Sequence, residues 1–343
     1  MNFILSNIWF SIIVGVISLA VLVYSADVAV RKLTGLAGFF RLSTTFVGVT
    51  VVSLATSIPE IVSHYTASVG ILSGLLDYKI SSAIVLGANI GSDVIQQTLI
   101  MAIVIFIAGQ LQFKRYFLWK SMGPMIISTL MCIGLGLDGT YSRIDGLILF
   151  GSFLAYMVFL YYDERKFYKE EDHGFTKDGE MPDNVPQTTG QAWKDVVISI
   201  TAIVATIFSS IIVLQLTEDI VSKTGLGGSL IGVMTLGVAS ALPELTTAVS
   251  GIKNGDSGIS LGTLIGSNVT NPLVAIGGGA IISTYWVPGP LVMWDLPWEA
   301  ITGAFLWAVL WFRNGHAGKK TAIYLTIMYF IYIGLRMRFF GVD

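Results

Sequence analysis

The sequence predicts an all-α membrane protein whose ten transmembrane helices form two inverted five-helix repeats. Hydrophobic residues make up 54% of the 343 residues and charged residues only 12%, with a mean hydropathy of +0.74. Ten apolar stretches are long enough to cross a bilayer, which takes roughly 20 residues. A motif in the second and third stretches returns in the seventh and eighth. This composition excludes a soluble globular enzyme and a disordered chain.

The predicted spans cover most of the chain. Their ranges are 7–26, 43–72, 80–109, 118–137, 145–162, 194–217, 226–252, 257–284, 290–312 and 319–335. No Lys or Arg precedes Arg31, so the basic start of a signal peptide is missing and we expect the first span to be retained. The spans divide the chain into a first five-helix repeat (1–162), a cytoplasmic polar linker (163–193) and a second five-helix repeat (194–343).

The linker is the one strongly polar stretch between the spans. Its charged residues and prolines are Glu170, Glu171, Asp172, Lys177, Asp178, Glu180, Pro182, Asp183 and Pro186. A calcium-sensing or partner-binding segment would have a similar composition. Composition alone favours a solvated linker.

Lys and Arg are distributed unequally between the two sides of the predicted membrane. With the N-terminus outside, fifteen of them fall in inside loops and five in outside loops. Because cytoplasmic loops are enriched in positive residues, we expect a plasma (inner) membrane protein with its N-terminus outside. Arg336 and Arg338, near the C-terminus, are at odds with this topology.

Two segments of the first half return in the second half. Residues 48–61 match residues 232–245 with identity at five of fourteen positions, and residues 86–94 match residues 261–269. Equivalent positions are five spans apart, and this odd number means that the halves insert with opposite orientation. Inverted repeats are typical of secondary transporters, whose sites lie at the midplane between the halves.

Each copy of the first segment places a glutamate inside a span, Glu60 in one half and Glu244 in the other. A carboxylate at the bilayer centre costs about 2.5–3.5 kcal/mol on insertion scales. No Lys or Arg lies within the four repeat-bearing spans, so a structural role would require protonated glutamates bonded to Ser or Thr. A cation site is the alternative, because hard cations take oxygen ligands and two carboxylates balance one divalent charge.

Further oxygen-bearing groups recur around the glutamates. Thr56 and Ser240 each lie four residues before a glutamate and therefore share its helix face. Pro59 and Pro243 lack an N–H, so they kink the helix and free a backbone carbonyl. The third and eighth spans add Ser92, Gln96, Ser267 and Asn271. A cage built only from oxygen disfavours zinc and copper.

The motifs resemble the two alpha-repeats of the sodium/calcium exchangers, within the cation/calcium antiporter superfamily. They read Thr56-Ser57-Ile58-Pro59-Glu60 and Ser240-Ala241-Leu242-Pro243-Glu244, each followed in the next span by a Gly-Ser pair. The resemblance covers the ten-span layout and therefore nearly the whole chain. It implies alternating access, with sodium entry driving calcium export and spans one and six sliding as the gate.

The resemblance also implies a set of ligands. The central calcium ligands fall on Glu60 and Glu244, with the backbone carbonyls of Thr56 and Ser240. The flanking sodium sites fall on Ser57, Ser92 and Ser267 and on the carbonyls of Ser53 and Gly237. The chain departs from the family at Ala241, where Ser is frequent, at Gln96, where Asn is frequent, and at Asn271, where several members have Asp. The last difference argues against potassium co-transport.

Two other titratable residues lie close to the motifs. Asp93 follows Ser92 and points about 100° away from it around the helix. It is either a hydrogen-bonding residue near a kink or a group that modulates ion coupling without forming the primary calcium site. His64 lies one turn after Glu60, where it either relays protons or packs as a hydrogen-bonded residue.

We therefore expect a secondary active antiporter that exchanges calcium for sodium, with a proton/calcium or other divalent cation exchanger as the alternative. An intramembrane hydrolase ranks low because its residue pairs are missing from the spans, and a binding-only receptor would not need an inverted repeat. The single cysteine, Cys132, excludes an intrachain disulfide and a cysteine-built metal site. The expected partners are the lipid bilayer and small inorganic cations, with no cofactor and, at a net charge of −2, no nucleic acid. The oligomeric state stays open.

Overall fold

The computed structural model describes residues 8–39, 53–113, 115, 118–167, 185–253 and 257–343. Within these residues, eight helices are long and apolar enough to cross a membrane, which confirms the predicted all-α membrane class. The two remaining predicted spans, 43–72 and 290–312, are not among the eight. The total of ten spans therefore stays a prediction. Most of the polar linker, residues 168–184, and the start of the first repeat motif, residues 48–52, lie outside the described residues.

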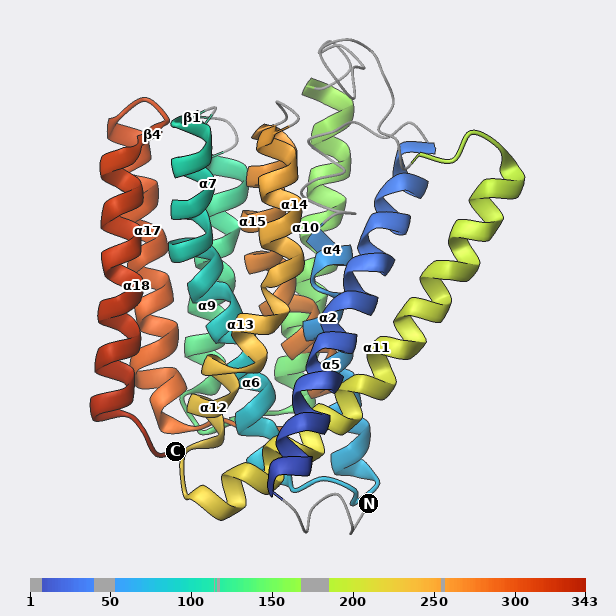
Figure 1. The fold of residues 1–343 in the computed structure, drawn as a ribbon. Helices are drawn as coiled ribbons and strands as arrows, with labels where there is room; N and C mark the ends of the chain where they lie inside the picture. Colours follow the sequence, from blue (N-terminus) through green and yellow to red (C-terminus); the bar gives the residue numbers. More distant parts are fainter. Residues whose placement is uncertain (1–7, 40–52, 114, 116–117, 168–184, 254–256) are drawn as a thin grey trace.

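The helices of the first half follow the predicted order (Figure 1). They are α2 (Ile8–Phe39), α4 (Ser53–Thr56), α5 (Ile58–Leu72), α6 (Tyr78–Ile95), the π-helical η2 (Gln96–Ile100), α7 (Met101–Ala108), the π-helical η3 (Leu118–Met122), α9 (Gly123–Gly136) and α10 (Arg143–Phe167).

The second half repeats this series. It consists of α11 (Thr189–Thr224), α12 (Gly228–Met234), α13 (Leu236–Ser240), α14 (Leu242–Lys253), α15 (Ser257–Thr270), the π-helical η4 (Asn271–Ile276), α16 (Gly277–Ile282), the π-helical η5 (Leu291–Asp295), α17 (Leu296–Phe312) and α18 (Lys319–Phe339).

Helices α2 and α11 are longer than the apolar stretches that predicted them. They pack against each other, and Figure 1 shows the pair as two long, inclined helices on one side of the bundle. Ion pairs four residues apart stabilise their polar turns: Arg31 with Asp27 at 2.8 Å, and Lys223 with Asp219 at 2.6 Å. Hydropathy marks only the part of a helix that lies in hydrocarbon, so it missed these polar extensions.

The inverted repeat is visible in irregular features that occur twice. The π-turns η2 and η4 directly follow α6 and α15, and the π-turns η3 and η5 directly precede α9 and α17. Strand β1 (Gln110–Gln112) pairs antiparallel with β4 (His316–Gly318), and β2 (Thr140–Tyr141) pairs antiparallel with β3 (Tyr285–Trp286). Each sheet joins a loop of one half to a loop of the other. The two sheets are therefore equivalent under the repeat.

Glycines bring the backbones of α6 and the broken helix α12–α13 into contact at the centre of the bundle. A Cβ atom added to Gly232 would lie 2.2 Å from the carbonyl oxygen of Ile84. A Cβ atom added to Gly237 would lie 2.7 Å from the carbonyl oxygen of Ala88 and 3.2 Å from the backbone nitrogen of Ser92. Only residues without a side chain fit here, and this close approach fixes the position of the second repeat motif against α6.

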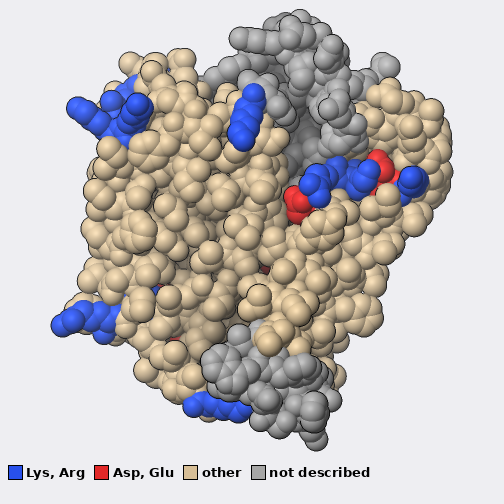
Figure 2. All heavy atoms as spheres, in the orientation of Figure 1, with Lys and Arg blue, Asp and Glu red and all other residues tan. Residues whose placement is uncertain are grey.

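The charged surface suits a membrane protein. Figure 2 shows the exposed Lys and Arg gathered near the upper and lower ends of the helices and at the upper ends of α2 and α11, with uncharged surface between them. Arg336, one of the two residues at odds with the predicted topology, has a fully buried side chain and forms an ion pair with Asp295 at 2.9 Å. Because this charge is neutralised inside the protein, it says little about the sidedness of the C-terminus.

Candidate cation site

The two glutamates lie in the first turns of helices that restart at a break in the middle of the bundle. Helix α5 begins directly after Ser57 and carries Glu60, and α14 begins directly after Ala241 and carries Glu244. In both helices a proline is the second residue, and its missing N–H interrupts the hydrogen-bond ladder from the preceding turn. The breaks therefore lie where the two prolines predict them.

A short chain of polar groups holds one oxygen of Glu60. The Ser92 hydroxyl donates to Glu60 Oε1 at 2.7 Å, and Gln96 Nε2 donates to Ser92 Oγ at 2.9 Å. Asn268 Nδ2 in turn donates to Gln96 Oε1 at 3.1 Å. The other carboxylate oxygen, Glu60 Oε2, is buried and has no hydrogen-bond partner among the residues that the structure describes. The first glutamate is thus held in place with one oxygen left available.

The second glutamate is less constrained. Both carboxylate oxygens of Glu244 are buried and have no hydrogen-bond partner in the described part of the chain, although the hydroxyls of Thr56 and Ser267 lie beside the carboxylate. Those two hydroxyl oxygens are 3.4 Å apart. The hydroxyl of Ser240 lies beside Glu60 in the same way. Each glutamate therefore faces a hydroxyl from the opposite repeat, and the two carboxylates are close enough for their charges to interact.

All twelve residues predicted for the site are buried in the structure. The Ser57 hydroxyl has no hydrogen-bond partner, the Ser53 hydroxyl lies 3.2 Å from Thr270 Oγ1, and the carbonyl of Gly237 accepts a bond from Ser240 at 3.3 Å. Nine of the twelve lie in the motif segments around the two glutamates, donate to one of the glutamates or lie beside one of them, namely Ser53, Thr56, Ser57, Glu60, Ser92, Gly237, Ser240, Glu244 and Ser267.

The other three predicted residues, Gln96, Asn271 and Asp93, occupy the border of this cluster. The Gln96 oxygen is already bonded to Asn268, so this side chain orients Ser92 and offers no free oxygen. Asn271 Nδ2 donates to Asp93 Oδ1 at 2.7 Å, which leaves Asn271 Oδ1 without a partner. Asp93 is thus bonded to a border residue and not to the hydroxyls beside the glutamates.

The structure adds a buried carboxylate that the sequence reasoning overlooked. Glu299, on α17, accepts a bond from Thr129 Oγ1 at 2.6 Å through Oε1, and its Oε2 has no partner. Glu299 lies close enough to Asp93 for their charges to interact. A glutamate inside the predicted span 290–312 was the signal that could have found it. Asn268, which links Gln96 and Gln97, was visible as the repeat partner of Asp93.

His64 lies in a separate buried group. Its Nδ1 is 3.2 Å from the hydroxyl of Tyr285, and the same hydroxyl lies 2.6 Å from Ser68 Oγ. The two rings meet edge to face with centroids 5.4 Å apart. This packing agrees with the second of the two roles considered for His64.

The chemistry of the cluster suits a hard cation. In the part of the chain that the structure describes, no group of three or more His, Cys, Asp or Glu side chains is arranged to hold a metal. No Lys or Arg among the described residues forms an ion pair with Glu60 or Glu244 either. The available ligands are two carboxylates together with hydroxyl and carbonyl oxygens, the set that calcium and sodium accept and that soft metals disfavour.

The family model of the sodium/calcium exchanger protein matches residues 10–162 and 194–338. The chain belongs to this family. The resemblance drawn from the two motifs is therefore confirmed, and the protein is a cation/calcium exchanger by family.

Two relatives of this exchanger are similar over most of their length. The putative antiporter CaxA of Alkalimonas amylolytica is 27% identical over 267 residues, which are 78% of this chain and 79% of that protein. The inner membrane protein YrbG of Escherichia coli (strain K12) is 22% identical over 322 residues, which are 93% and 94% of the two chains.

Two kinds of solved exchanger share the fold. The crystal structure of the H⁺/Ca²⁺ exchanger CAX has a TM-score of 0.73 at 18% identity and covers 96% of this chain and 87% of its own. The sodium-calcium exchanger NCX_Mj has a TM-score of 0.62 at 19% identity, with coverages of 96% and 99%. At such identities the likeness establishes the fold, and it leaves the coupling ion open because the two neighbours differ in it.

Proposed function

We propose that this exchanger is a secondary active antiporter that moves calcium out in exchange for sodium, by alternating access around Glu60 and Glu244. One calcium ion binds between the two carboxylates in one state, and monovalent cations replace it in the other. The plasma (inner) membrane is the expected location, with the N-terminus outside and the 163–193 linker in the cytoplasm.

One observation carries this proposal. Three carboxylate oxygens from the two repeats, Glu60 Oε2 and both oxygens of Glu244, are buried and have no hydrogen-bond partner among the described residues. A buried carboxylate that lacks a partner costs several kcal/mol, so a protein retains two of them only if a cation compensates them during the cycle. The repeat relation of the two glutamates suits a site that opens to either side in turn.

Sodium is the favoured driver because neutral oxygens surround the carboxylates. Ser57 has a buried hydroxyl without a partner, and Thr56, Ser240 and Ser267 supply hydroxyls beside the glutamates. Protons would need only the carboxylates, whereas sodium ions need several additional oxygen ligands.

A proton/calcium exchanger is the second candidate, and a specific observation favours it. Asp93 and Glu299 are two further buried carboxylates whose charges interact, and neither forms an ion pair in the described part of the chain. Asp93 is bonded to the border residue Asn271. Carboxylates inside a membrane protein are a frequent route for protons. The H⁺/Ca²⁺ exchanger CAX is also among the solved structures that share the fold.

Flux in proteoliposomes distinguishes the two candidates. Purified exchanger is reconstituted, and ⁴⁵Ca²⁺ uptake is followed with a sodium gradient at fixed pH and, separately, with a pH gradient in sodium-free buffer. The proposal expects uptake with the sodium gradient. Uptake with the pH gradient alone would assign proton coupling, and absence of uptake in both arms, with protein shown to be folded, would contradict calcium antiport. Vesicles containing Glu244→Gln protein serve as the leak control.

A further inference from the structure

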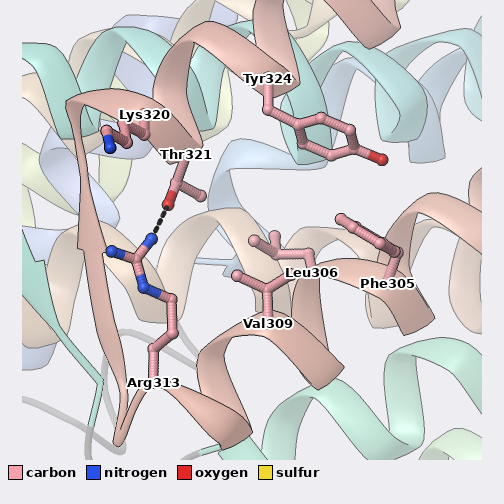
Figure 3. Close-up of a pocket in the computed structure, with 7 residues that line it drawn as sticks. All are labelled: Phe305, Leu306, Val309, Arg313, Lys320, Thr321 and Tyr324. Carbon is pink, nitrogen blue, oxygen red and sulfur yellow. Dashed lines mark hydrogen bonds between the residues drawn. The ribbon is translucent and has the colours of Figure 1, made fainter.

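A slot between α17 and α18 has a chemistry unrelated to the central cluster. It is a cavity of about 190 Å³ near the ends of α17 and α18 that the β4 segment connects. Figure 3 shows Arg313, Lys320 and Thr321 at one end of the slot, Phe305 and Tyr324 at the other, and Leu306 and Val309 between them. The slot is therefore basic at one end and apolar along the rest.

The basic end holds two cations that no carboxylate neutralises in the described residues. Arg313 Nη1 lies 3.5 Å from Thr321 Oγ1, which is a weak contact for a guanidinium. Arg313 and Lys320 are both exposed, and neither forms a salt bridge in the described structure. The pocket lining contains no Asp or Glu. This end presents two positive charges and a hydroxyl, a set that suits a phosphate group.

The apolar end of the slot lies farther along α17 and α18, away from the loop that connects them. Phe305 lies eight residues before Arg313 on α17, a distance of about 12 Å at 1.5 Å per residue. The rings of Phe305 and Tyr324 have centroids 4.9 Å apart, and Phe305 is 46% exposed. Leu306 is buried and forms part of the floor. A soluble anion would contact only the basic end and leave this apolar surface facing hydrocarbon.

We propose that the slot between α17 and α18 binds one anionic glycerophospholipid. Its phosphate lies between Arg313 and Lys320, and the upper part of an acyl chain lies against Phe305, Val309 and Tyr324. An anionic headgroup suits the two uncompensated positive charges better than a zwitterionic one, whose own cation opposes them. In the proposed topology this end faces the cytoplasm, where basic residues near the membrane attract anionic lipids. The bound lipid ties α17 to α18.

Native mass spectrometry of the full-length exchanger in detergent tests this proposal. Phosphatidylglycerol and phosphatidylcholine are titrated against the wild-type protein and the variant Arg313→Gln/Lys320→Gln. We expect phosphatidylglycerol to bind the wild type about tenfold or more tightly than it binds the variant, since each basic residue near an anionic surface contributes about a factor of five. Phosphatidylcholine should bind the wild type and the variant with similar affinity.

Two further variants separate a built slot from general surface charge. Lys79→Gln/Arg143→Gln removes the same net charge at the opposite end of the bundle and should leave phosphatidylglycerol binding unchanged. Val309→Trp fills the slot without changing the charge and should weaken binding. An equal loss in the Lys79/Arg143 control, or full binding by the Arg313/Lys320 variant, would overturn the proposal. If inorganic phosphate raised the unfolding temperature as much as phosphatidylglycerol does, the slot would be a site for a free anion and not for a lipid.

Discussion

Two buried acidic regions of this exchanger differ in what neutralises their negative charge. Asp295 receives Arg336 Nε on both oxygens, at 3.0 and 2.9 Å, and the Tyr332 hydroxyl at 2.7 Å. Arg336 Nη2 also donates to Ser229 Oγ at 2.5 Å. Within the described structure, Glu60 has one hydrogen-bonded oxygen and Glu244 has none. The first region is neutralised within the protein, and the second is left for an ion from outside it.

This difference separates structure from function among buried charges. An ion pair inside a membrane protein replaces lost hydration with a fixed cation, so it holds helices η5 and α18 together without any further ligand. No Lys or Arg in the described ranges pairs with the glutamates of the two repeats, so their negative charge favours whichever cation enters. Mutations in the two regions should therefore have opposite signatures, with transport lost in one and stability lost in the other.

The largest expected effect is on transport at the two glutamates. Glu60→Gln and Glu244→Gln each leave one carboxylate for a divalent ion in a buried site. A loss of about 3 kcal/mol would weaken calcium binding by more than about 100-fold. We expect calcium flux in proteoliposomes to fall to the leak level for each variant, with size-exclusion profile and unfolding temperature close to wild type. Near-normal flux by either variant would remove the distinction between the two regions.

The opposite signature is expected at Asp295. Asp295→Asn leaves Arg336 buried without its charge partner, and breaking a buried pair from one side costs about 3–5 kcal/mol. The unfolding temperature in detergent should fall strongly, while the protein that remains folded should still exchange calcium. The matched variant Arg336→Met/Asp295→Leu removes both charges and should recover much of the lost stability. Failure of that recovery would mean that the pair does more than hold helices together.

A smaller effect is expected from packing alone at Gly237. A Cβ atom there would lie 2.7 Å from the Ala88 carbonyl oxygen, and overpacking of this kind costs about 1–3 kcal/mol. Gly237→Ala should push α13 away from α6, lower the unfolding temperature moderately and slow flux through misplacement of Ser240. Gly289→Ala is the control, because nothing lies within 4 Å of a Cβ added there. Equal flux by both alanine variants would show that the close approach is not needed for transport.

The smallest effect on transport is expected at Asp93 and Glu299. Asp93→Asn and Glu299→Gln should change the dependence of calcium flux on sodium concentration or pH by a few fold and leave calcium binding in place, since neither residue is bonded to the hydroxyls beside Glu60 and Glu244. Flux is measured across a grid of sodium concentrations and pH values. A loss of calcium binding by Asp93→Asn comparable with Glu60→Gln would place Asp93 among the primary ligands.

The features that could be predicted from the sequence are those that depend on local chemistry. Residue composition gave the membrane class, the Pro-Glu motifs located both helix breaks, and the repeated segments led to the family. Features set by tertiary contacts were out of reach. No sequence pattern near Asp295 indicates that Arg336, 41 residues away, is its partner. No residue spacing indicates that Asp93 accepts a hydrogen bond from Asn271 or that its charge interacts with that of Glu299. Glu299 has no acidic counterpart in the other half, so the repeat pattern does not single it out.

Equilibrium dialysis with ⁴⁵Ca²⁺ tests the central claim most directly, because it needs no knowledge of the coupling ion. Purified wild type, Glu60→Gln, Glu244→Gln and Asp295→Asn are compared in sodium-free buffer at fixed pH. The account predicts one saturable calcium ion per chain for wild type and for folded Asp295→Asn, and none for either glutamate variant at the same calcium concentrations. Saturable binding of one ion by Glu60→Gln or Glu244→Gln with wild-type affinity would contradict it.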